Sequence, residues 1–187
     1  MSKNGALFVQ DAAGRYYDAC RRGNLFSYNQ TTVGALSVSS ATAITGMNIY
    51  NPGGSAKAIA FYRAIITTAT LPAAQFGFAL FGGAQAILPT TLTITGVIVA
   101  ALNVGKGLPS NTAVQLQSIA TVLNVLLVRA ISGGGAGATT AQLTPAVIDV
   151  DLGGEVMQYP GTCVNVQAVT TAVSTTMTII GEEVPAV

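Results

Sequence analysis

Three carboxylates near the C-terminal end of the chain are the residues best suited to chemistry. Asp149 and Asp151 stand two positions apart in an alternating run, and Glu155 follows them. Residues two apart in a strand share a face, and carboxylates placed in this way can bind a hard cation such as Ca²⁺. No loop oxygens that would complete such a site are recognisable, so we favour a solvated or arginine-paired face. The same pair could act as glycosidase acids only at a separation that the fold would have to fix.

Histidine is absent from all 187 residues. This excludes Ser-His-Asp and Cys-His catalysis and every metal site that needs histidine. The sequence has neither a G-x-G-x-x-G after a strand nor a Walker A motif. Cys20 has no base beside it, and we expect Cys20 and Cys163 to be free thiols in a chain without a recognisable signal peptide. We therefore predict no enzyme, and no catalytic, cofactor-binding or metal-binding residues.

An aromatic and basic cluster lies near the N-terminus. Its members are Tyr16, Tyr17, Arg21, Arg22, Phe26 and Tyr28. Such residues can bind nucleic acid, but two arginines are few, and tyrosine and arginine are also enriched at protein interfaces. We expect an interface anchor. The net charge of +1 implies no strong attraction to nucleic acid or to a membrane surface.

Charge is scarce along the chain, at 8% of residues against about 25% in an ordinary domain. A surface so poor in charge keeps a free monomer soluble only poorly, so we expect much of it to be buried against other subunits. A monomer covered by threonine is the alternative. Basic residues gather in the first third and acidic residues in the last quarter, an arrangement that could dock subunits or form pairs within one chain. No run reaches the roughly 18 apolar residues of a membrane span, which favours synthesis in a cytoplasm.

The element that organises the chain is an alternating stretch from Ala43 to Thr68. Asn51-Pro52-Gly53-Gly54-Ser55 interrupts it, because proline fixes φ and glycine favours turns. We predict two long strands joined as a β-hairpin, with a positive φ at Gly53 or Gly54. A second turn is predicted at Tyr159-Pro160-Gly161.

Short alternating runs recur on both sides of this stretch. We predict strands at 6–10, 15–20, 25–29, 75–80, 90–102, 122–131, 145–152, 164–168 and 175–181, turns at 21–24 and 153–154, and loops at 69–74, 103–111 and 132–140. The segment 113–121 fits either a strand or a helical turn. This pattern predicts an all-β fold, an antiparallel β-sandwich that is jelly-roll-like. We assign 1–30 to an N-terminal arm with short strands and 31–187 to the sandwich domain.

Two segments resemble small all-β virion proteins of tailed bacteriophages. IYNPGGSAKAIAFYRA is similar to their N-P-x-G-S hairpin, and IDVDLGG…YPGTCVNVQAV…TMTIIGEEVP is similar to their closing strands, which end in E-E-V-P. The residues that carry the resemblance are Asn51, Pro52, Gly54, Ser55, Pro160, Gly161, Val164, Val166, Glu182, Glu183, Val184 and Pro185. That family usually places a tryptophan shortly before E-E-V-P, where this chain has Ile180-Gly181.

The resemblance implies a jelly-roll subunit, often a homotrimer, attached to the outside of an icosahedral head as a cement or decoration protein. Its partner would be the shell of major capsid protein, and its place the virion surface after synthesis in the host cytoplasm. Another virion component (a head fibre base, a tail protein or a shell subunit) is the first alternative. A carbohydrate-binding adhesion module is the second, and it would need an aromatic platform or a Ca²⁺ site.

Overall fold

The computed structural model describes residues 16–36, 43–69, 76–84, 98–103, 115–121, 123–134, 147–169 and 173–186. These residues form one helix, α1 (Tyr17–Arg22), and the following strands: β1 (Leu25–Ala35), β2 (Ala43–Asn51), β3 (Lys57–Thr68), β4 (Phe76–Ala84), β5 (Ile98–Asn103), β6 (Gln115–Thr121), β7 (Leu123–Gly134), β8 (Val147–Gln158), β9 (Thr162–Ala168) and β10 (Ser174–Pro185). The first 15 residues, with the predicted strand at 6–10 and most of the predicted arm, lie outside the described residues.

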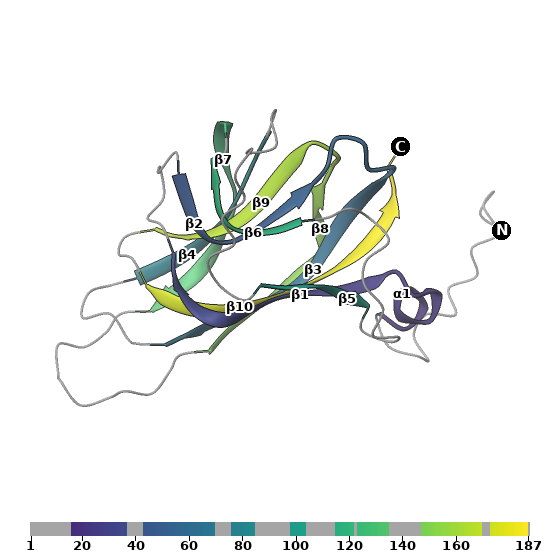
Figure 1. Cartoon of the computed structure of the whole chain (residues 1–187). Coiled ribbons are helices and arrows are strands. Elements are labelled where there is room, and N and C mark those ends of the chain that lie inside the picture. The colour runs from purple at the N-terminus through teal and green to yellow at the C-terminus, as the bar shows by residue number, and fades with distance from the viewer. Residues whose placement is uncertain are drawn as a thin grey trace.

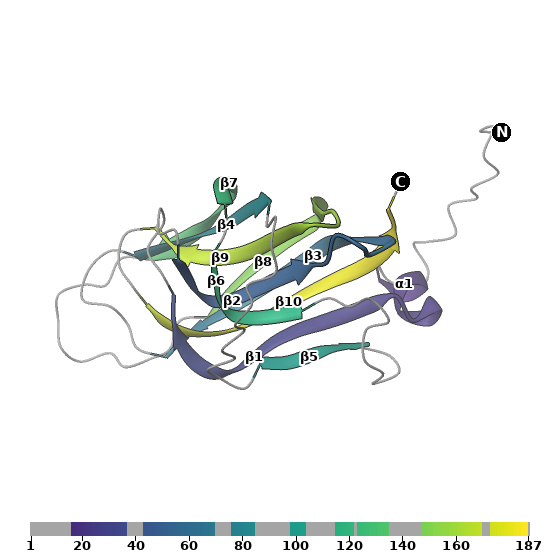
Figure 2. The same ribbon diagram turned by 45° about the horizontal axis from the view of Figure 1, so that its top comes forward.

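The strands form two antiparallel sheets (Figure 1). Sheet A has the order β5-β1-β10-β3-β8, and sheet B has the order β6-β2-β9-β4-β7. The prediction of an all-β, antiparallel fold is therefore confirmed. Figures 1 and 2 both place α1 beside the end of sheet A at which β1 begins and β10 ends.

The strand pairs are nested within one another along the chain. β1 pairs with β10, β2 with β9, β3 with β8 and β4 with β7. The pairs are joined into sheets because β10 also pairs with β3, and β9 also pairs with β4. β5 and β6 extend the two sheets beyond β1 and β2. Consecutive strands along the chain therefore alternate between the sheets over β1 to β4 and over β7 to β10.

A hydrophobic core fills the space between the sheets. β10 alternates strictly between buried and half-buried residues from Ser174 to Val184, as expected for a strand with one face on the core. Sheet A contributes Phe26, Tyr28, Phe61, Ile66 and Ile179, among others, and sheet B contributes Ile49, Phe78, Leu80, Val164 and Val166.

The prediction of a β-hairpin between β2 and β3 is wrong. β2 pairs with β6 and β9 in sheet B, whereas β3 pairs with β10 and β8 in sheet A. Both segments are strands as predicted, but the connection at 52–56 crosses from one sheet to the other. Five residues are long enough to cover the roughly 10 Å between packed sheets. Neither Gly53 nor Gly54 has a positive φ, so the predicted backbone requirement at this turn is also wrong.

The predicted strand at 15–20 is a helix where the structure describes it, from Tyr17 to Arg22. The helix ends at Gly23, whose φ of 78° is left-handed and whose N–H bonds back to the last turn. Glycine is the residue that most readily adopts this conformation at a helix end. The predicted boundary at residue 30 falls inside β1, so Leu25–Ala35 is part of sheet A and not of an arm.

Other predicted elements correspond to observed strands, often with longer bounds. The predictions at 75–80, 122–131, 164–168 and 175–181 match β4, β7, β9 and β10, and those at 25–29 and 145–152 match parts of β1 and β8. The segment 113–121, left open, is a strand from Gln115. Of the strand predicted at 90–102, residues 98–102 are in β5 and the rest lie outside the described residues. Most of the predicted loops, residues 70–74, 104–111 and 135–140, also lie outside the described residues. Residues 132–134 continue β7.

Gly153 and Gly154 form a bulge and not the predicted turn. β8 runs through them to Gln158, with φ values of 64° and 80°. Phe61 of β3 lies opposite Val156, whereas Arg63 lies opposite Asp151. The extra residues of β8 are therefore accommodated beside Tyr62. A bulge of this kind re-aims side chains without ending the strand.

Among the described residues, the only helix is far shorter than a membrane span requires.

Candidate functional site

The two predicted turns meet at one end of the sandwich. The Gly161 N–H donates to the Asn51 carbonyl over 2.7 Å, and the Ser55 N–H donates to the Pro52 carbonyl over 2.9 Å. Gly161 has a φ of 80°, and a Cβ added there would lie 3.8 Å from the Cα of Gly53. The connections at 52–56 and 159–161 are thus held directly against each other.

Two buried carboxamides tie these turns to the strands. The Asn51 side chain donates to the carbonyls of Lys57, at 2.9 Å, and Gln158, at 3.4 Å. The Gln158 side chain donates to the carbonyls of Ile49, at 2.7 Å, and Thr162, at 2.8 Å. Both residues are almost completely buried. Carboxamides suit this role because their N–H groups satisfy backbone carbonyls that the crossing chain leaves unpaired.

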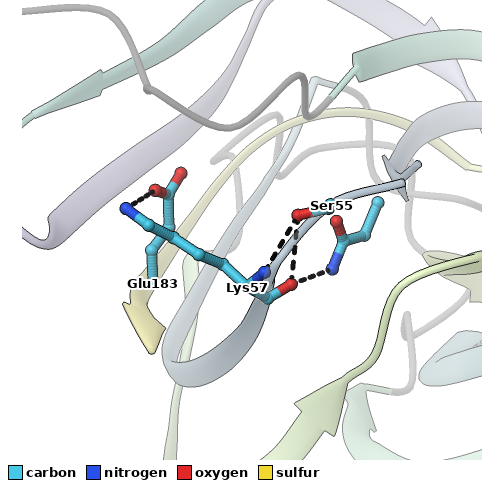
Figure 3. A network of polar contacts seen from close by, with 4 residues as sticks. Ser55, Lys57 and Glu183 are labelled. Carbon is cyan, nitrogen blue, oxygen red and sulfur yellow. Dashed lines mark hydrogen bonds and ion pairs between the residues drawn. The ribbon is translucent and has the colours of Figure 1, made fainter. Parts of the chain in front are cut away.

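A buried carboxylate lies beside this network (Figure 3). Glu183 of β10 is buried, and the Lys57 ammonium lies 3.4 Å from its Oε2. Ser55 bonds both the N–H and the carbonyl of Lys57, each over 3.2 Å. Burial, and secondarily the negative charge of Glu183, raises the pKa of Tyr28 well above its usual range. The Lys57 ammonium offsets the cost of keeping the Glu183 carboxylate in the interior.

Most of the residues that carry the resemblance to phage virion proteins are brought together here, whereas Val164 and Val166 lie in the core. Asn51 lies opposite Thr162, next to Gly161, and Lys57 lies opposite Pro185 in the pairing of β3 with β10. The N-P-x-G-S segment, the Tyr159-Pro160-Gly161 turn and the E-E-V-P segment, which lie far apart in the sequence, therefore meet at one end of the molecule. We call this end, residues 51–57, 158–162 and 182–185, the turn end.

The predicted interface cluster divides into two parts. Phe26 and Tyr28 point into the core and are almost fully buried, so the prediction that they lie at an interface is wrong. The other four members stay at the surface of the chain. Tyr17 is 53% exposed, the Arg22 Nε donates to the Asp18 carbonyl, and Arg21 lies 4.0 Å from the Asp18 carboxylate.

Tyr16 connects α1 to the outer face of sheet A. Its ring lies 4.9 Å from that of Tyr62, centroid to centroid. The Tyr62 hydroxyl donates to Glu182 over 2.6 Å. Gly154 provides the room for this ring, since a Cβ there would lie 2.9 Å from it. The sequence did not single out Tyr62, because a bulge that turns it outward leaves no pattern in the alternation.

The acidic residues are arranged as pairs and not as a cation site. Asp149 binds Arg63 through both carboxylate oxygens, and these hydrogen bonds hold the pKa of Asp149 below its usual range. Asp151 accepts from the Gly153 N–H over 2.9 Å, and Glu155 lies 3.1 Å from Arg129. In the described part of the chain, no group of three or more acidic or cysteine side chains is placed to hold a metal. The arginine-paired alternative is the one observed for Asp149 and Glu155.

These pairs also answer the question raised by the uneven charge distribution. Lys57 and Arg63 from the first half of the chain pair with Glu183 and Asp149 from its last quarter. Basic and acidic segments therefore meet inside one chain, because the nested strand order places β3 between β8 and β10. On α1, by contrast, Arg21 and Arg22 contact Asp18 of the same helix.

The two cysteines do not bond to each other. Cys163 is buried, and burial raises the pKa of its thiol to about 12. Cys20 is half-buried on α1. A thiol that stays protonated is a poor nucleophile, so Cys163 has a packing role.

A row of buried polar side chains on the outer face of sheet B was missed by sequence reasoning. Asn48 and Asn165 lie opposite each other, and the Gln167 Nε2 donates to the Asn165 Oδ1 over 2.8 Å. All three are completely buried, as is Cys163 on the same face. In β9 both faces are therefore buried, whereas its alternation of apolar and polar residues suggests one solvated face.

Among the described residues, Asp149, Glu155 and Glu183 pair with cations, the buried Cys163 thiol has a raised pKa, and the carboxamides of Asn51 and Gln158 donate to backbone carbonyls. Comparison of the chain with family models, with curated proteins and with solved structures gives no match.

Proposed function

We propose that this chain is a non-enzymatic virion structural protein: a capsid cement or decoration protein. As a homotrimer, it binds the outside of an icosahedral phage head, after synthesis in the host cytoplasm, and stabilises that head. Its partner is the shell of major capsid protein.

The fold we propose for it is a jelly roll with one inserted strand pair. With β5 and β6 set aside, the sheets read β1-β10-β3-β8 and β2-β9-β4-β7. A long antiparallel ribbon that is folded at β4–β7 and rolled into two sheets produces this nested order. Double-sheet jelly rolls of eight strands occur in viral capsid and lectin domains.

The observation that carries the functional proposal is the turn end. The turns and the E-E-V-P end of the segments that resemble phage virion proteins lie together at one end of the sandwich, and hydrogen bonds from Asn51, Gln158 and Gly161 hold the two turns together. Several similar motifs that are remote in sequence but adjacent in space support a common origin with those virion proteins better than one isolated turn does. The scarcity of charge, at 8% of residues, supports a chain that works with much of its surface covered.

The mechanism we propose is mechanical. A protein that binds the assembled head, and not its separated subunits, stabilises the assembly by mass action. Each site contributes RT ln(1 + [L]/Kd), which is about 2.7 kcal/mol when the free protein is at 100 times its Kd. The many equivalent sites of an icosahedral shell multiply this modest contribution.

Co-sedimentation with heads tests the proposal. Heads of the phage that encodes the chain are prepared without it, mixed with the purified protein, and separated on a gradient. We expect saturable binding to intact heads, no binding to unassembled shell protein, and a higher temperature of head disruption. Failure to bind heads overturns the proposal. Recovery of the chain with purified tails instead would assign it to another virion component.

A further inference from the structure

The helix α1 depends on docking for its form. It has only six residues, and an isolated helix shorter than about 12 residues is marginal in water. Within Tyr17–Arg22, all of which the structure describes, Ala19 is the one buried residue. Asp18, Arg21 and Arg22 interact with one another at the surface of the helix, and exposed contacts of this kind stabilise little. The helix is therefore held by what it touches on sheet A.

A pair of tyrosine rings joins α1 to the outer face of sheet A. Tyr16, the residue before the helix, has its ring centroid 4.9 Å from that of Tyr62 on β3, with the ring planes 45° apart. Aromatic rings at this separation attract each other when they are tilted. The Tyr62 hydroxyl donates to Glu182 of β10, and the Tyr62 ring lies against Gly154 of β8. Sheet A therefore holds the Tyr62 ring in place, and Tyr16 docks against it.

The boundary between α1 and sheet A falls within two residues. Gly23 ends the helix with a φ of 78°. The Asn24 N–H donates to the Ala19 carbonyl, whereas the Asn24 carbonyl accepts from the Glu183 N–H of β10, each over 2.9 Å. From Leu25 onward the chain pairs with β10. A change of backbone dihedrals at Gly23, which glycine tolerates better than any other residue, therefore moves α1 without breaking a strand pair.

The sandwich does not use α1 in its strand pairing. In the described part of the chain, the strand pairs of sheet A are all made by residues outside Tyr17–Arg22. Figures 1 and 2 show α1 at one end of the molecule, beyond the start of β1. The members of the predicted interface cluster that stay at the surface, Tyr16, Tyr17, Arg21 and Arg22, all lie on this helix or at its start. They move with α1 if it leaves the sheet.

We propose that α1 is a strap: it docks on the outer face of sheet A through Tyr16 and detaches about Gly23 as one unit, while both sheets stay folded. This inference does not rest on the proposed function. It gives the chain a docked state, in which Tyr17, Arg21 and Arg22 are held against the sandwich, and a released state, in which they move relative to it. A partner that binds these side chains better in one state shifts the balance between the two.

Two neighbouring tyrosines provide a matched test. Tyr16→Ala removes the ring that contacts Tyr62, whereas Tyr17→Ala removes a ring that is 53% exposed. Tyr62→Ala removes the same contact from the side of the sheet. Hydrogen–deuterium exchange of the full chain, followed by mass spectrometry, compares the amides of residues 20–24 with those of residues 175–184 in β10. Exchange rates report how readily each region opens.

In the parent, we expect the amides of residues 20–24 to exchange at least about a hundredfold faster than those of β10, and more slowly than in an unfolded peptide. Tyr16→Ala should accelerate residues 20–24 about tenfold further, the factor that corresponds to the loss of an aromatic pair and its buried area. It should leave β10 unchanged. Tyr62→Ala should accelerate residues 20–24 to a similar extent, and Tyr17→Ala should leave both regions as they are.

Three results would overturn the proposal. Equal protection of residues 20–24 and β10 in the parent would mean that α1 opens only with the whole fold. Exchange of residues 20–24 as fast as in an unfolded peptide would mean that the strap is not docked. An acceleration by Tyr17→Ala as large as that by Tyr16→Ala would mean that the Tyr16 ring is not the contact that holds it. If Tyr62→Ala also accelerates β10, Tyr16→Ala decides, because it leaves the side chains of sheet A intact.

Discussion

Asn51 is the residue on which the turn end depends most. Its carboxamide serves the carbonyls of Lys57 and Gln158 in a fully buried position. Asn51→Ala should lower the free energy of unfolding by about 1–3 kcal/mol, because a buried carbonyl loses its donor. Urea unfolding followed by circular dichroism measures this. Ser55→Ala is the control, since its hydroxyl is only partly buried, and a loss there as large as at Asn51 would contradict this ranking.

Asp149 makes the free energy of unfolding depend on pH in the acidic range. Its hydrogen bonds to Arg63 lower its folded pKa, below the value of about 3.9 expected for the unfolded chain. The stabilisation is therefore present above about pH 4 and is lost as the pH falls through the folded pKa. Asp149→Asn should be slightly less stable than the parent at pH 7, and the difference should shrink towards pH 2.5. It stays small throughout because the pair is exposed.

Urea unfolding at the two pH values tests this assignment. About 1 M NaCl, at which the screening length is about 3 Å, should also reduce the difference between the parent and Asp149→Asn. A difference that is equal at both pH values would mean that the carboxylate contributes through its shape and not through its charge.

Cys163 should be inert in the folded protein. Burial raises its pKa to about 12, so it has almost no thiolate at pH 8, and reagents cannot reach it. Titration with a disulfide reagent should count one reactive thiol in the native protein, Cys20, and two in guanidinium chloride. Cys20→Ser should leave none in the native state. Rapid native reaction of that variant would show that the outer face of sheet B opens readily.

The bulge in β8 predicts which glycines tolerate a side chain. Gly154 has a φ of 80°, and an added Cβ would lie 2.9 Å from the Tyr62 ring. Gly154→Ala should therefore destabilise the protein by at least about 1–2 kcal/mol, the cost of the left-handed conformation alone. Gly54 has nothing within 4 Å of an added Cβ and no positive φ, so Gly54→Ala should change stability by less than about 1 kcal/mol.

Melting temperatures of the two alanine variants give the comparison. Equal melting temperatures would show that Tyr62 moves aside freely and that the bulge is not the constraint described here.

Strand positions could be read from the sequence, but strand partners could not. Alternation marks which residues of β10 face the core, and it placed most strands within a few residues. It does not say whether the next strand lies in the same sheet. The segment 52–56 has the composition of a hairpin turn and yet crosses between the sheets. Gly153-Gly154 has the composition of a turn and yet continues a strand.

The site was predictable only where side chains sit in turns. Proline and glycine pointed to both turns of the turn end, but nothing in the sequence showed that they meet, because that depends on the pairing of Asn51 with Thr162. Glu183 follows Glu182, whose side chain faces outward. Because successive side chains of a strand point to opposite faces, the Glu183 side chain of β10 is buried. Phe26 and Tyr28 looked like interface anchors because a short strand gives no sign of which face is covered.

At the scale of the molecule, β10 holds sheet A together. It lies between β1 and β3 and pairs with both along most of its length. Deleting residues 174–187 should abolish the cooperative unfolding transition and not merely lower its midpoint, because the two halves of sheet A lose contact. Differential scanning calorimetry and near-ultraviolet circular dichroism would show this. A chain without its first 14 residues is the control, since none of the strand pairs described above includes them.

A truncated chain that still melts cooperatively would contradict the central role of β10. In that case β1 would have to pair directly with β3, and the register of sheet A would differ from the one described.

The central place of β10 also bears on biosynthesis. β10 follows every strand with which it pairs, so sheet A cannot close until the ribosome has released it. Until then the nascent chain presents β1 and β3 with unsatisfied edges, which invite aggregation or capture by chaperones. Products of interrupted translation cannot fold and are open to proteolysis. Because of this order of strands, only chains that have been translated through β10 can fold.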